Sequence, residues 1–317
     1  MVSINDIEDF MISFLTKIKL KDIFKILLNP KLIVIRVLYA LKRLFYDLFY
    51  FFIRDKYRYK IIFLAGMPMS ATTKLKNMCG RIDGYFTRHN PTPEKIWLNQ
   101  DITNQTFKHC PSWGYSLLKT HLNPKDENIE TIKRNRVKKV IVSYRDLRDV
   151  VVARYYRLLN FPKKKNEPNY LEEIRQYKNI SKSEGINDCI EKIATLYTKW
   201  IYGWFDIASK HKNFILFCKF EDLVSNPKEQ FKKILDFYEI SMSDSKINSI
   251  VKETEGKKNM QTNFGEAKIL PWALSSNFRS GKIGNWRDEF DTTNIRRFKE
   301  LAGESLIRLK YEKNFNW

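Results

Sequence analysis

The sequence contains little cysteine and little histidine. Its four cysteines are spread along the chain, with no C-x-x-C pair and no His-x-x-x-His spacing, which excludes the common structural zinc sets and favours reduced thiols. These cysteines are Cys79, Cys110, Cys189 and Cys218. Four histidines in 317 residues leave few candidates for a general base near neutral pH, so a histidine inside a recognisable motif becomes a stronger catalytic candidate.

A secretory signal and a long uninterrupted apolar run are also missing. The extreme N-terminus is acidic at Asp6, Glu8 and Asp9, where a cleavable signal would be basic. Residues 32–53 are very apolar, but charged side chains interrupt them well before the roughly 18 to 20 residues that a membrane span needs. We therefore expect a cytoplasmic protein without a simple transmembrane anchor.

Residues 1–58 are expected to form an N-terminal amphipathic helical segment ahead of a single domain over residues 59–317. Charged residues between positions 36 and 54 fall on one stripe of a helix whose other faces are apolar or aromatic. They are Arg36, Arg43, Asp47 and Arg54. Two interpretations stay open: the helix lies in a membrane interface with its arginines at the headgroups, or it packs on the main domain.

Acidic residues are in deficit. The chain has 57 Lys and Arg against 36 Asp and Glu, a formal net charge of +21, which indicates an anionic partner such as a phosphorylated cofactor, an acidic substrate or a membrane surface. Compositional drift that serves only solubility is the alternative. Nucleic acid would also fit the charge, but no recognition motif for it is present, so we expect no nucleic-acid partner.

From residue 60 onward, short β-rich runs alternate with longer helical patterns, as in βαβ units around a parallel sheet. The expected strands are 60–66, 114–121, 137–145 and 213–221, and the expected helices are 71–80, 147–159, 186–209, 226–238 and 293–310. Pro227 suits the first position of its helix. Residues 160–185 are polar and interrupted by proline, and are expected to form a long loop or loosely packed insert.

The stretch "AGMPMSATTKL" at residues 65–75 follows an apolar strand and opens a helix. Free backbone N–H groups at a helix N-terminus favour a phosphate, and the serine and threonines add hydroxyl groups. The stretch does not satisfy the ATP-type pattern G-x-x-x-x-G-K-[ST], because Ala71 and Thr72 stand where that pattern has glycine and lysine. A kinase or triphosphate hydrolase is therefore not expected.

Four further stretches carry basic residues at the ends of expected strands or in glycine-punctuated loops. They are "LLKTHLNP" (117–124), "YRDLRDVVVARYYR" (144–157), "FEDLVSNPKEQFKKILDFYEI" (220–240) and "FRSGKIGNWRDEF" (278–290). In the first, Lys119 and His121 share one face of an extended chain, which pairs a cation with a possible general base. The last has the composition of a phosphate clamp.

In this order, the five stretches resemble the sulfotransferase family that uses 3′-phosphoadenosine 5′-phosphosulfate (PAPS), in particular its cytosolic-type branch. The resemblance covers about residues 60–290. It implies an α/β three-layer sandwich with a central parallel sheet and a strand, phosphate loop and helix like those of P-loop NTPases. It also implies PAPS as the sulfuryl donor, no metal, and an acceptor hydroxyl or amine.

The resemblance assigns roles to individual residues. His121 matches the catalytic base, and Lys119 matches a lysine beside the transferred sulfonate. The matches to nucleotide-binding positions are Ser70, Ala71, Thr72, Thr73 and Lys74 in the 5′-phosphosulfate loop, Arg145, Arg279, Ser280 and Gly281 at the 3′-phosphate, and Phe220, Thr254 and Phe278 near the nucleoside.

Five residues depart from the family pattern: Met69 replaces a lysine, Ala71 a glycine, Lys74 a tryptophan, Ala153 a serine and Phe220 a tyrosine. Each lost hydrogen bond to a charged group costs about 1.5 to 3 kcal/mol. These departures keep a second interpretation open, a catalytically weakened or noncatalytic nucleotide-binding scaffold associated with a membrane.

The acceptor is expected to be a small molecule, a lipid or a carbohydrate, bound by the regions around 84–113 and 158–185. Aromatic residues in the first region indicate an apolar or ring-stacking pocket, with core packing as the alternative. They are Tyr85, Phe86, Trp97, Phe107 and Trp113.

Overall fold

The computed structural model describes residues 55–87, 98–108, 110, 114–160, 175–255 and 281–317, together with residues 41 and 45. Most of the predicted N-terminal segment, residues 1–58, therefore lies outside the described residues. Tyr57 is buried against Tyr85 and Tyr115, so the packed domain includes it. A domain boundary at residue 58 remains a prediction.

The described residues form one parallel sheet of five strands in the order β2-β3-β1-β4-β5. The strands are β1 (Ile61–Gly66), β2 (Tyr85–Thr87), β3 (Tyr115–Thr120), β4 (Val140–Tyr144) and β5 (Ile215–Lys219). β1 is central, since it pairs in parallel with β3 on one side and with β4 on the other. The carboxyl ends of these three strands meet at one edge, where open α/β sheets bind their ligands.

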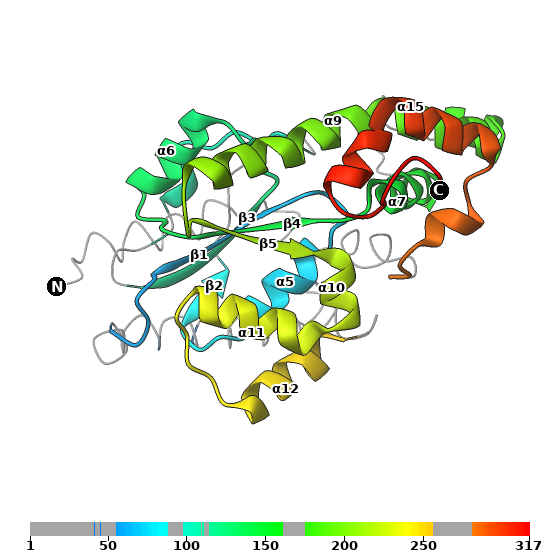
Figure 1. Cartoon of the computed structure of the whole chain (residues 1–317). Coiled ribbons are helices and arrows are strands. Elements are labelled where there is room, and N and C mark those ends of the chain that lie inside the picture. The colour runs from blue at the N-terminus through cyan, green and yellow to red at the C-terminus, as the bar shows by residue number, and fades with distance from the viewer. Residues whose placement is uncertain are drawn as a thin grey trace, which may run out of the picture.

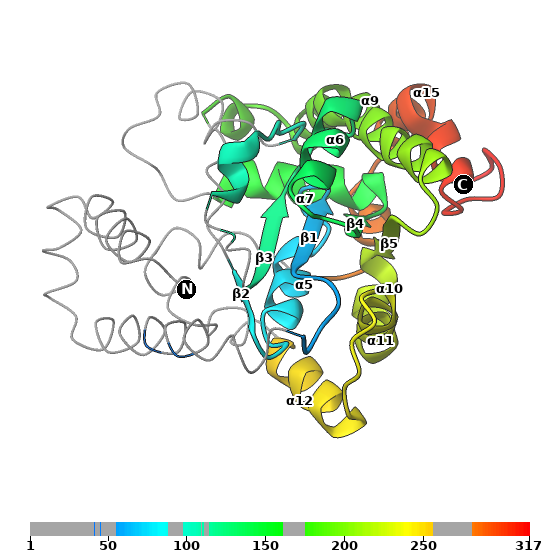
Figure 2. The same ribbon diagram turned by 90° about the vertical axis from the view of Figure 1, so that its left-hand side faces the viewer.

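Helices cover both faces of the sheet and make three layers (Figures 1 and 2). On one face lie α6 (Asp126–Arg134), α7 (Leu147–Asn160), α9 (Lys182–Lys210) and α15 (Thr292–Arg308), and on the other α5 (Thr72–Cys79), α10 (Phe220–Ser225), α11 (Pro227–Phe237) and α12 (Asp244–Thr254). Two short 3₁₀ helices are η1 (Asn104–Phe107) and η3 (Asn285–Asp288). The predicted three-layer α/β fold is confirmed.

β1 shows why the sequence folds this way. Phe63 and Ala65 pack into the core under α7 and α9, whereas Ile62 and Leu64 pack into the core under α5 and α11. Successive side chains of a strand point to opposite faces, so a strand covered on both faces is apolar throughout. β1 is accordingly buried along its whole length.

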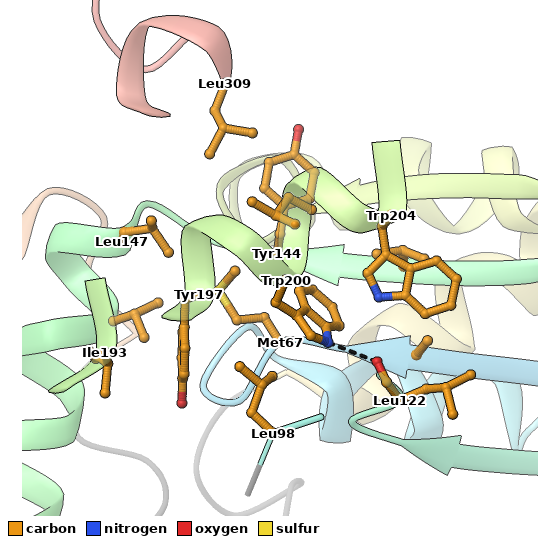
Figure 3. Close-up of a cluster of buried hydrophobic side chains, with 14 of the residues drawn as sticks. Met67, Leu98, Leu122, Tyr144, Leu147, Ile193, Tyr197, Trp200, Trp204 and Leu309 are labelled. Atoms are coloured by element: carbon orange, nitrogen blue, oxygen red, sulfur yellow. Dashed lines mark hydrogen bonds between the residues drawn. The ribbon is translucent and has the colours of Figure 1, made fainter. Parts of the chain in front are cut away.

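The core under α9 reaches the edge of the sheet where the candidate site lies. Met67, which directly follows β1, belongs to the same buried cluster as Tyr197 and Trp200 of α9 (Figure 3). The Trp200 indole Nε1 donates a hydrogen bond of 2.8 Å to the carbonyl oxygen of Leu122. α9 thereby fixes the backbone that follows β3.

The predicted strands and long helices are present, and α11 begins at Pro227 as expected. One prediction about a boundary is wrong: α9 begins at Lys182, inside the predicted loop 160–185, because Ser181 and Glu184 form a reciprocal capping box. The short strand β2 and the helices α6, α10 and α12 were not predicted. All four cysteines are buried and free, in agreement with the predicted reduced thiols.

Candidate active site

The loop between β1 and α5 is held tightly to β4. The Ser70 hydroxyl lies 2.6 Å from the Met67 carbonyl oxygen and 2.8 Å from the Ser143 hydroxyl. Because a carbonyl only accepts, Ser70 donates to Met67 and accepts from Ser143. The side chain predicted to bind the 5′-phosphate therefore braces the loop, and the Ser70 backbone N–H donates to the same Met67 carbonyl oxygen over 3.3 Å.

Gly66 ends β1 at a point where no other residue fits. A Cβ atom at this position would lie 1.7 Å from the Thr72 methyl carbon Cγ2 and 2.6 Å from the Ser143 hydroxyl oxygen. Thr72, the first residue of α5, is buried and presses its methyl group toward Gly66. This close approach folds the loop back over the end of the strand.

Ala71 precedes α5 in the left-handed region, with φ of 59° and ψ of 25°. The family pattern has glycine here, and the backbone conformation that glycine favours is retained. Alanine has no side-chain oxygen, so Ala71 makes no side-chain capping hydrogen bond to α5. Met69, where a lysine was expected, also has a positive φ of 67°.

We predict that Ala71→Gly stabilises the protein by roughly 0.5 to 1 kcal/mol. A left-handed alanine costs about 1 to 2 kcal/mol, and the greater freedom of glycine in the unfolded chain offsets part of this gain. Urea denaturation followed by circular dichroism measures the change. Ala302→Gly in α15 is the control and should lower the unfolding free energy, since Ala302 is a buried helical residue. Equal destabilisation by both substitutions would contradict the strain at Ala71.

Lys119 and His121 lie at the end of β3, next to the loop. The Lys119 ammonium donates to the Thr73 hydroxyl over 3.2 Å. The His121 backbone N–H donates to Gln100 Oε1 over 2.8 Å, and its ring Nδ1 hydrogen-bonds the Gly66 carbonyl oxygen. Since that oxygen only accepts, Nδ1 carries the proton, and Nε2 of the neutral ring holds a lone pair. This is the tautomer that a general base needs.

Burial sets the charge state of both groups. It lowers the pKa of His121 to about 4, and the positive charges of Lys119 and Arg157 act in the same direction, against the Gly66 hydrogen bond. It also lowers the pKa of Lys119 to about 8, assisted by the positive charges of Lys76 and Arg157. At neutral pH the pair is therefore a neutral imidazole beside an ammonium.

Arg145 follows β4 and connects three parts of the site. Its guanidinium lies 3.9 Å from the centre of the Phe220 ring, and its Nη2 donates to the Lys282 carbonyl oxygen over 3.0 Å. The same Nη2 lies 3.3 Å from Asp149 Oδ2. The two predicted nucleotide-binding residues Arg145 and Phe220 are thus in contact, with a stacked geometry that arginine favours.

Asp149 is a functional candidate that the sequence did not reveal. Besides pairing with Arg145, its carboxylate accepts hydrogen bonds from the backbone N–H groups of Gly284, over 2.9 Å, and Trp286, over 3.0 Å. Burial raises the pKa of Asp149, while the Arg145 charge opposes that shift. The sequence offered one sign of this role, an acidic residue in the first turn of the helix α7, and the structure buries that residue. Asp149 joins the loop after Gly281 to Arg145.

The remaining predicted nucleotide-binding residues differ in their surroundings. Lys74 is buried and its ammonium donates to the Leu223 carbonyl oxygen over 3.3 Å, with a pKa lowered by burial. The Thr254 hydroxyl is turned back to its own helix, 2.8 Å from the Ile250 carbonyl oxygen. Gly281 has a positive φ of 65°. Phe278, Arg279 and Ser280 lie outside the described residues.

Arg148, three residues after Arg145, is the centre of a buried cluster of charged and aromatic side chains. Its guanidinium bonds Asp146 over 2.7 Å and Glu312 over 2.6 Å. It also contacts two indole rings, 3.9 Å from the Trp286 ring centre and 4.5 Å from that of Trp317. Fully paired buried charges of this kind resist rearrangement, because removing one partner leaves an uncompensated charge. The cluster ties the C-terminal segment to η3 and to the start of α7.

The described residues contain no group of three or more His, Cys, Asp or Glu side chains arranged to hold a metal ion. Among these same residues, no helix combines the length and the apolar character that a membrane crossing requires.

Comparison with known proteins places this arrangement in a family. The sulfotransferase domain model matches residues 61–310. Sulfotransferase 1A1 of Rattus norvegicus is 29% identical over 190 residues, which are 57% of this chain and 60% of the relative. Sulfotransferase 1C2 of Homo sapiens is 30% identical over 106 residues, 32% of this chain and 35% of the relative. The matches thus span less than two thirds of these relatives' length.

Solved structures agree on the fold. Mouse sulfotransferase SULT7A1 complexed with PAP superimposes with a TM-score of 0.56 at 21% identity, covering 78% of this chain and 84% of that one. Retinol dehydratase in complex with androsterone and PAP gives a TM-score of 0.52 at 17% identity, with 82% and 85% covered. Because the family match extends over most of the chain and coincides with the sheet and the loop described above, the chain belongs to the sulfotransferase domain family.

Proposed function

We propose that this protein is a PAPS-dependent sulfotransferase that transfers a sulfuryl group to an acceptor hydroxyl or amine, with His121 as the general base. The observation that carries the proposal is the hydrogen bond between His121 Nδ1 and the Gly66 carbonyl, which leaves Nε2 as the acceptor of a proton beside the phosphate loop. The low pKa of His121, about 4, keeps the ring neutral at physiological pH.

The donor site is proposed from three features. The uncapped N-terminus of α5 offers backbone N–H groups to the 5′-phosphosulfate, and the left-handed Ala71 keeps that terminus accessible. Arg145, stacked on Phe220, is the ligand for the 3′-phosphate. Two structural neighbours were solved with PAP, the nucleotide that remains after sulfuryl transfer. PAPS supplies the sulfuryl group when bound.

The chemistry needs a base and a cation. As the acceptor oxygen forms its bond to sulfur, His121 Nε2 takes the hydroxyl proton. The bond between sulfur and the bridging oxygen breaks, and its electron pair leaves with the 5′-phosphate, so that 3′,5′-ADP and the sulfate ester are the products. Lys119, 3.2 Å from Thr73 Oγ1, is the cation beside this loop and takes the charge-stabilising role that Met69 cannot fill.

We predict a bell-shaped pH dependence of kcat/KM, with an acid limb near pH 4 and an alkaline limb near pH 8. His121 must be neutral, so activity falls as pH drops through its pKa of about 4. Lys119 must be charged, so activity falls as pH rises through its pKa of about 8. Initial rates from about pH 3 to 10 measure both limbs. Lys119→Arg should remove the alkaline limb, because arginine stays charged; an unchanged limb would assign it to another group.

Transfer from labelled PAPS tests the function itself. Purified protein is incubated with sterol, lipid, phenol and sugar acceptors, and binding of 3′,5′-ADP is measured by calorimetry. Labelled product together with nucleotide binding supports the proposal. Tight 3′,5′-ADP binding without transfer to any acceptor would contradict it and support the noncatalytic scaffold.

The proposed location is the cytoplasm, and a membrane surface is a proposed partner of residues 1–58. The two described residues of that segment's apolar run, Leu41 and Phe45, are one helical turn apart and 54% and 55% exposed. Such a pair suits an interface between water and lipid. A small molecule, a lipid or a carbohydrate remains the proposed acceptor.

A further inference from the structure

The aromatic residues expected to line an acceptor pocket are packed in the interior instead. Tyr85, Phe86 and Phe107 are 2%, 6% and 6% exposed. Phe107 stacks on Phe63 with ring centres 6.2 Å apart. Trp97 and Trp113 lie outside the described residues. The described rings therefore have a structural role.

One of these rings, Tyr85, belongs to a tyrosine cluster at the edge of the sheet opposite the candidate site. Tyr85 and Tyr115 are the first residues of β2 and β3. Tyr57 packs on both rings, with ring centres 5.5 and 5.2 Å apart, and its backbone N–H donates to the Tyr115 hydroxyl over 2.9 Å. Because these strands are parallel, residues 55–60 bring the chain into the domain at the edge where all the strands begin.

The same edge carries two basic segments that contain no acidic residue. Residues 133–139 run from the last turn of α6 to β4, and residues 210–214 run from the end of α9 to β5. The segments lie side by side, since the Val140 N–H donates to the Phe214 carbonyl oxygen over 2.8 Å and the Lys133 ammonium is 3.1 Å from His211 Nδ1. In Figure 1 they lie on the left, where β4 and β5 begin. Their basic residues, here called the basic edge, are Lys133, Arg134, Arg136, Lys138, Lys139, Lys210 and Lys212.

Only part of this charge is compensated within the domain. Arg134 pairs with Glu130, Lys139 with Glu239 and Lys210 with Asp126. Within the described part of the chain, no ion pair involves Arg136, Lys138 or Lys212, and all three residues are exposed. Cations favour a helix C-terminus, which accounts for Lys133 and Arg134 in the last turn of α6. The same effect does not reach Lys138, four residues past the end of that helix.

Arg136 stands at a position that suits glycine. Its φ is 67°, in the left-handed region. Its N–H donates to the Lys133 carbonyl oxygen over 3.0 Å, and the Val137 N–H donates to the Ile132 carbonyl oxygen over 3.0 Å. This is the Schellman arrangement, in which the left-handed residue after a helix is usually glycine. Since a larger residue is strained there and Arg136 is exposed, packing within the domain gives no reason for an arginine.

We propose that the basic edge docks on an anionic membrane surface, next to the point where the N-terminal segment joins the domain. One apolar segment gives only weak, reversible membrane binding, and stable attachment takes a second signal such as a polybasic patch. Leu41 and Phe45, 54% and 55% exposed, belong to the apolar segment, and the basic edge supplies the electrostatic signal. This interface lies outside the proposed sulfotransferase function and does not depend on it.

Docking at this edge holds the candidate site away from the membrane. β1 runs from Ile61, at the edge where the strands begin, to Gly66, whose carbonyl bonds His121. A strand of this length extends over roughly 17 Å, at about 3.3 Å per residue. The candidate site therefore faces the aqueous side, where a nucleotide can enter it while the domain is docked.

Co-sedimentation of the full chain with vesicles tests the inference. Wild-type protein should bind vesicles of phosphatidylcholine and phosphatidylserine more tightly than pure phosphatidylcholine vesicles, and the difference should shrink as salt is added. The triple variant Arg136→Gln, Lys138→Gln, Lys212→Gln should bind the anionic vesicles on the order of 100-fold more weakly, since each lost cation weakens binding about fivefold. Lys138→Gln alone should lose about fivefold, which checks the triple variant with a single exposed substitution.

The matched control is the triple variant Arg296→Gln, Lys310→Gln, Lys313→Gln. It loses the same charge from exposed residues on or just after α15, which lies on the right in Figure 1. It should bind the anionic vesicles nearly as tightly as the wild type, and circular dichroism should show the same unfolding temperature for all three proteins.

Four results would overturn the inference. Equal losses in the two triple variants would mean that overall charge alone drives binding. Wild-type binding by the basic-edge variant would leave attachment to the N-terminal segment. Equal wild-type binding to both kinds of vesicle would exclude an electrostatic contact. A single-stranded RNA oligonucleotide that displaces the vesicles from the wild type, and does not bind the basic-edge variant, would assign this surface to nucleic acid.

Discussion

His121→Ala is expected to lower kcat by about 10²- to 10⁴-fold, the usual contribution of a positioned general base. The acceptor hydroxyl would then lose its proton to water. The Kd for 3′,5′-ADP should stay unchanged, because the His121 side chain bonds the Gly66 carbonyl and is assigned no contact with the nucleotide. Initial rates with saturating PAPS and calorimetry with 3′,5′-ADP give the two quantities separately.

A second histidine serves as the control for this experiment. His211 lies at the C-terminal end of α9, where the Lys133 ammonium is 3.1 Å from its Nδ1. His211→Ala should retain the wild-type kcat. If His121→Ala were as active as the wild type, the assigned mechanism would be wrong. If it also lost nucleotide binding, His121 would act by holding the loop through Gly66.

Gly66→Ala is expected to lower the free energy of unfolding by about 3 kcal/mol, the upper part of the range for overpacking, and to abolish 3′,5′-ADP binding. The added methyl group would lie 1.7 Å from Thr72 Cγ2 and 2.6 Å from Ser143 Oγ, so α5 and β4 would have to separate. That separation displaces the helix N-terminus proposed to hold the 5′-phosphate. Urea denaturation and calorimetry report the two effects.

Two further variants sharpen this prediction. Gly80→Ala is the matched control, since Gly80 has an ordinary helical φ of −70° and its nearest Cβ neighbour is the Lys76 carbonyl oxygen at 3.1 Å. The double variant Gly66→Ala with Thr72→Ser removes the methyl group that causes the closest contact and should recover part of the stability. Wild-type stability in Gly66→Ala alone would refute the account of the loop.

The sequence predicted the parts of the fold and site that have local signatures. Apolar runs such as β1 need burial on both faces, so the parallel sheet followed from the residues themselves. Lys119, His121 and Arg145 were recognisable because they stand at strand ends, and the structure brings them to one edge of the sheet. Short elements such as β2, with three residues, carry too little pattern to be predicted.

Other site residues act through contacts between distant segments, which leave no local pattern. Asp149 bonds backbone groups more than 130 positions away, at Gly284 and Trp286. Gln100 orients His121 through a backbone hydrogen bond from a different segment. Ser70 was assigned to phosphate by type, yet its hydroxyl bonds Ser143, because residue type does not determine which way a side chain points.

The Arg148 cluster has an optical consequence. Trp286 and Trp317 both contact one buried guanidinium, and the Trp286 backbone shares the Asp149 carboxylate with Arg145. A nucleotide that draws Arg145 toward its phosphate therefore changes the electric field around an indole ring without touching it. Indole emission depends on such fields, so we expect these tryptophans to report on the proposed donor site, and titration with 3′,5′-ADP to change the emission without a label.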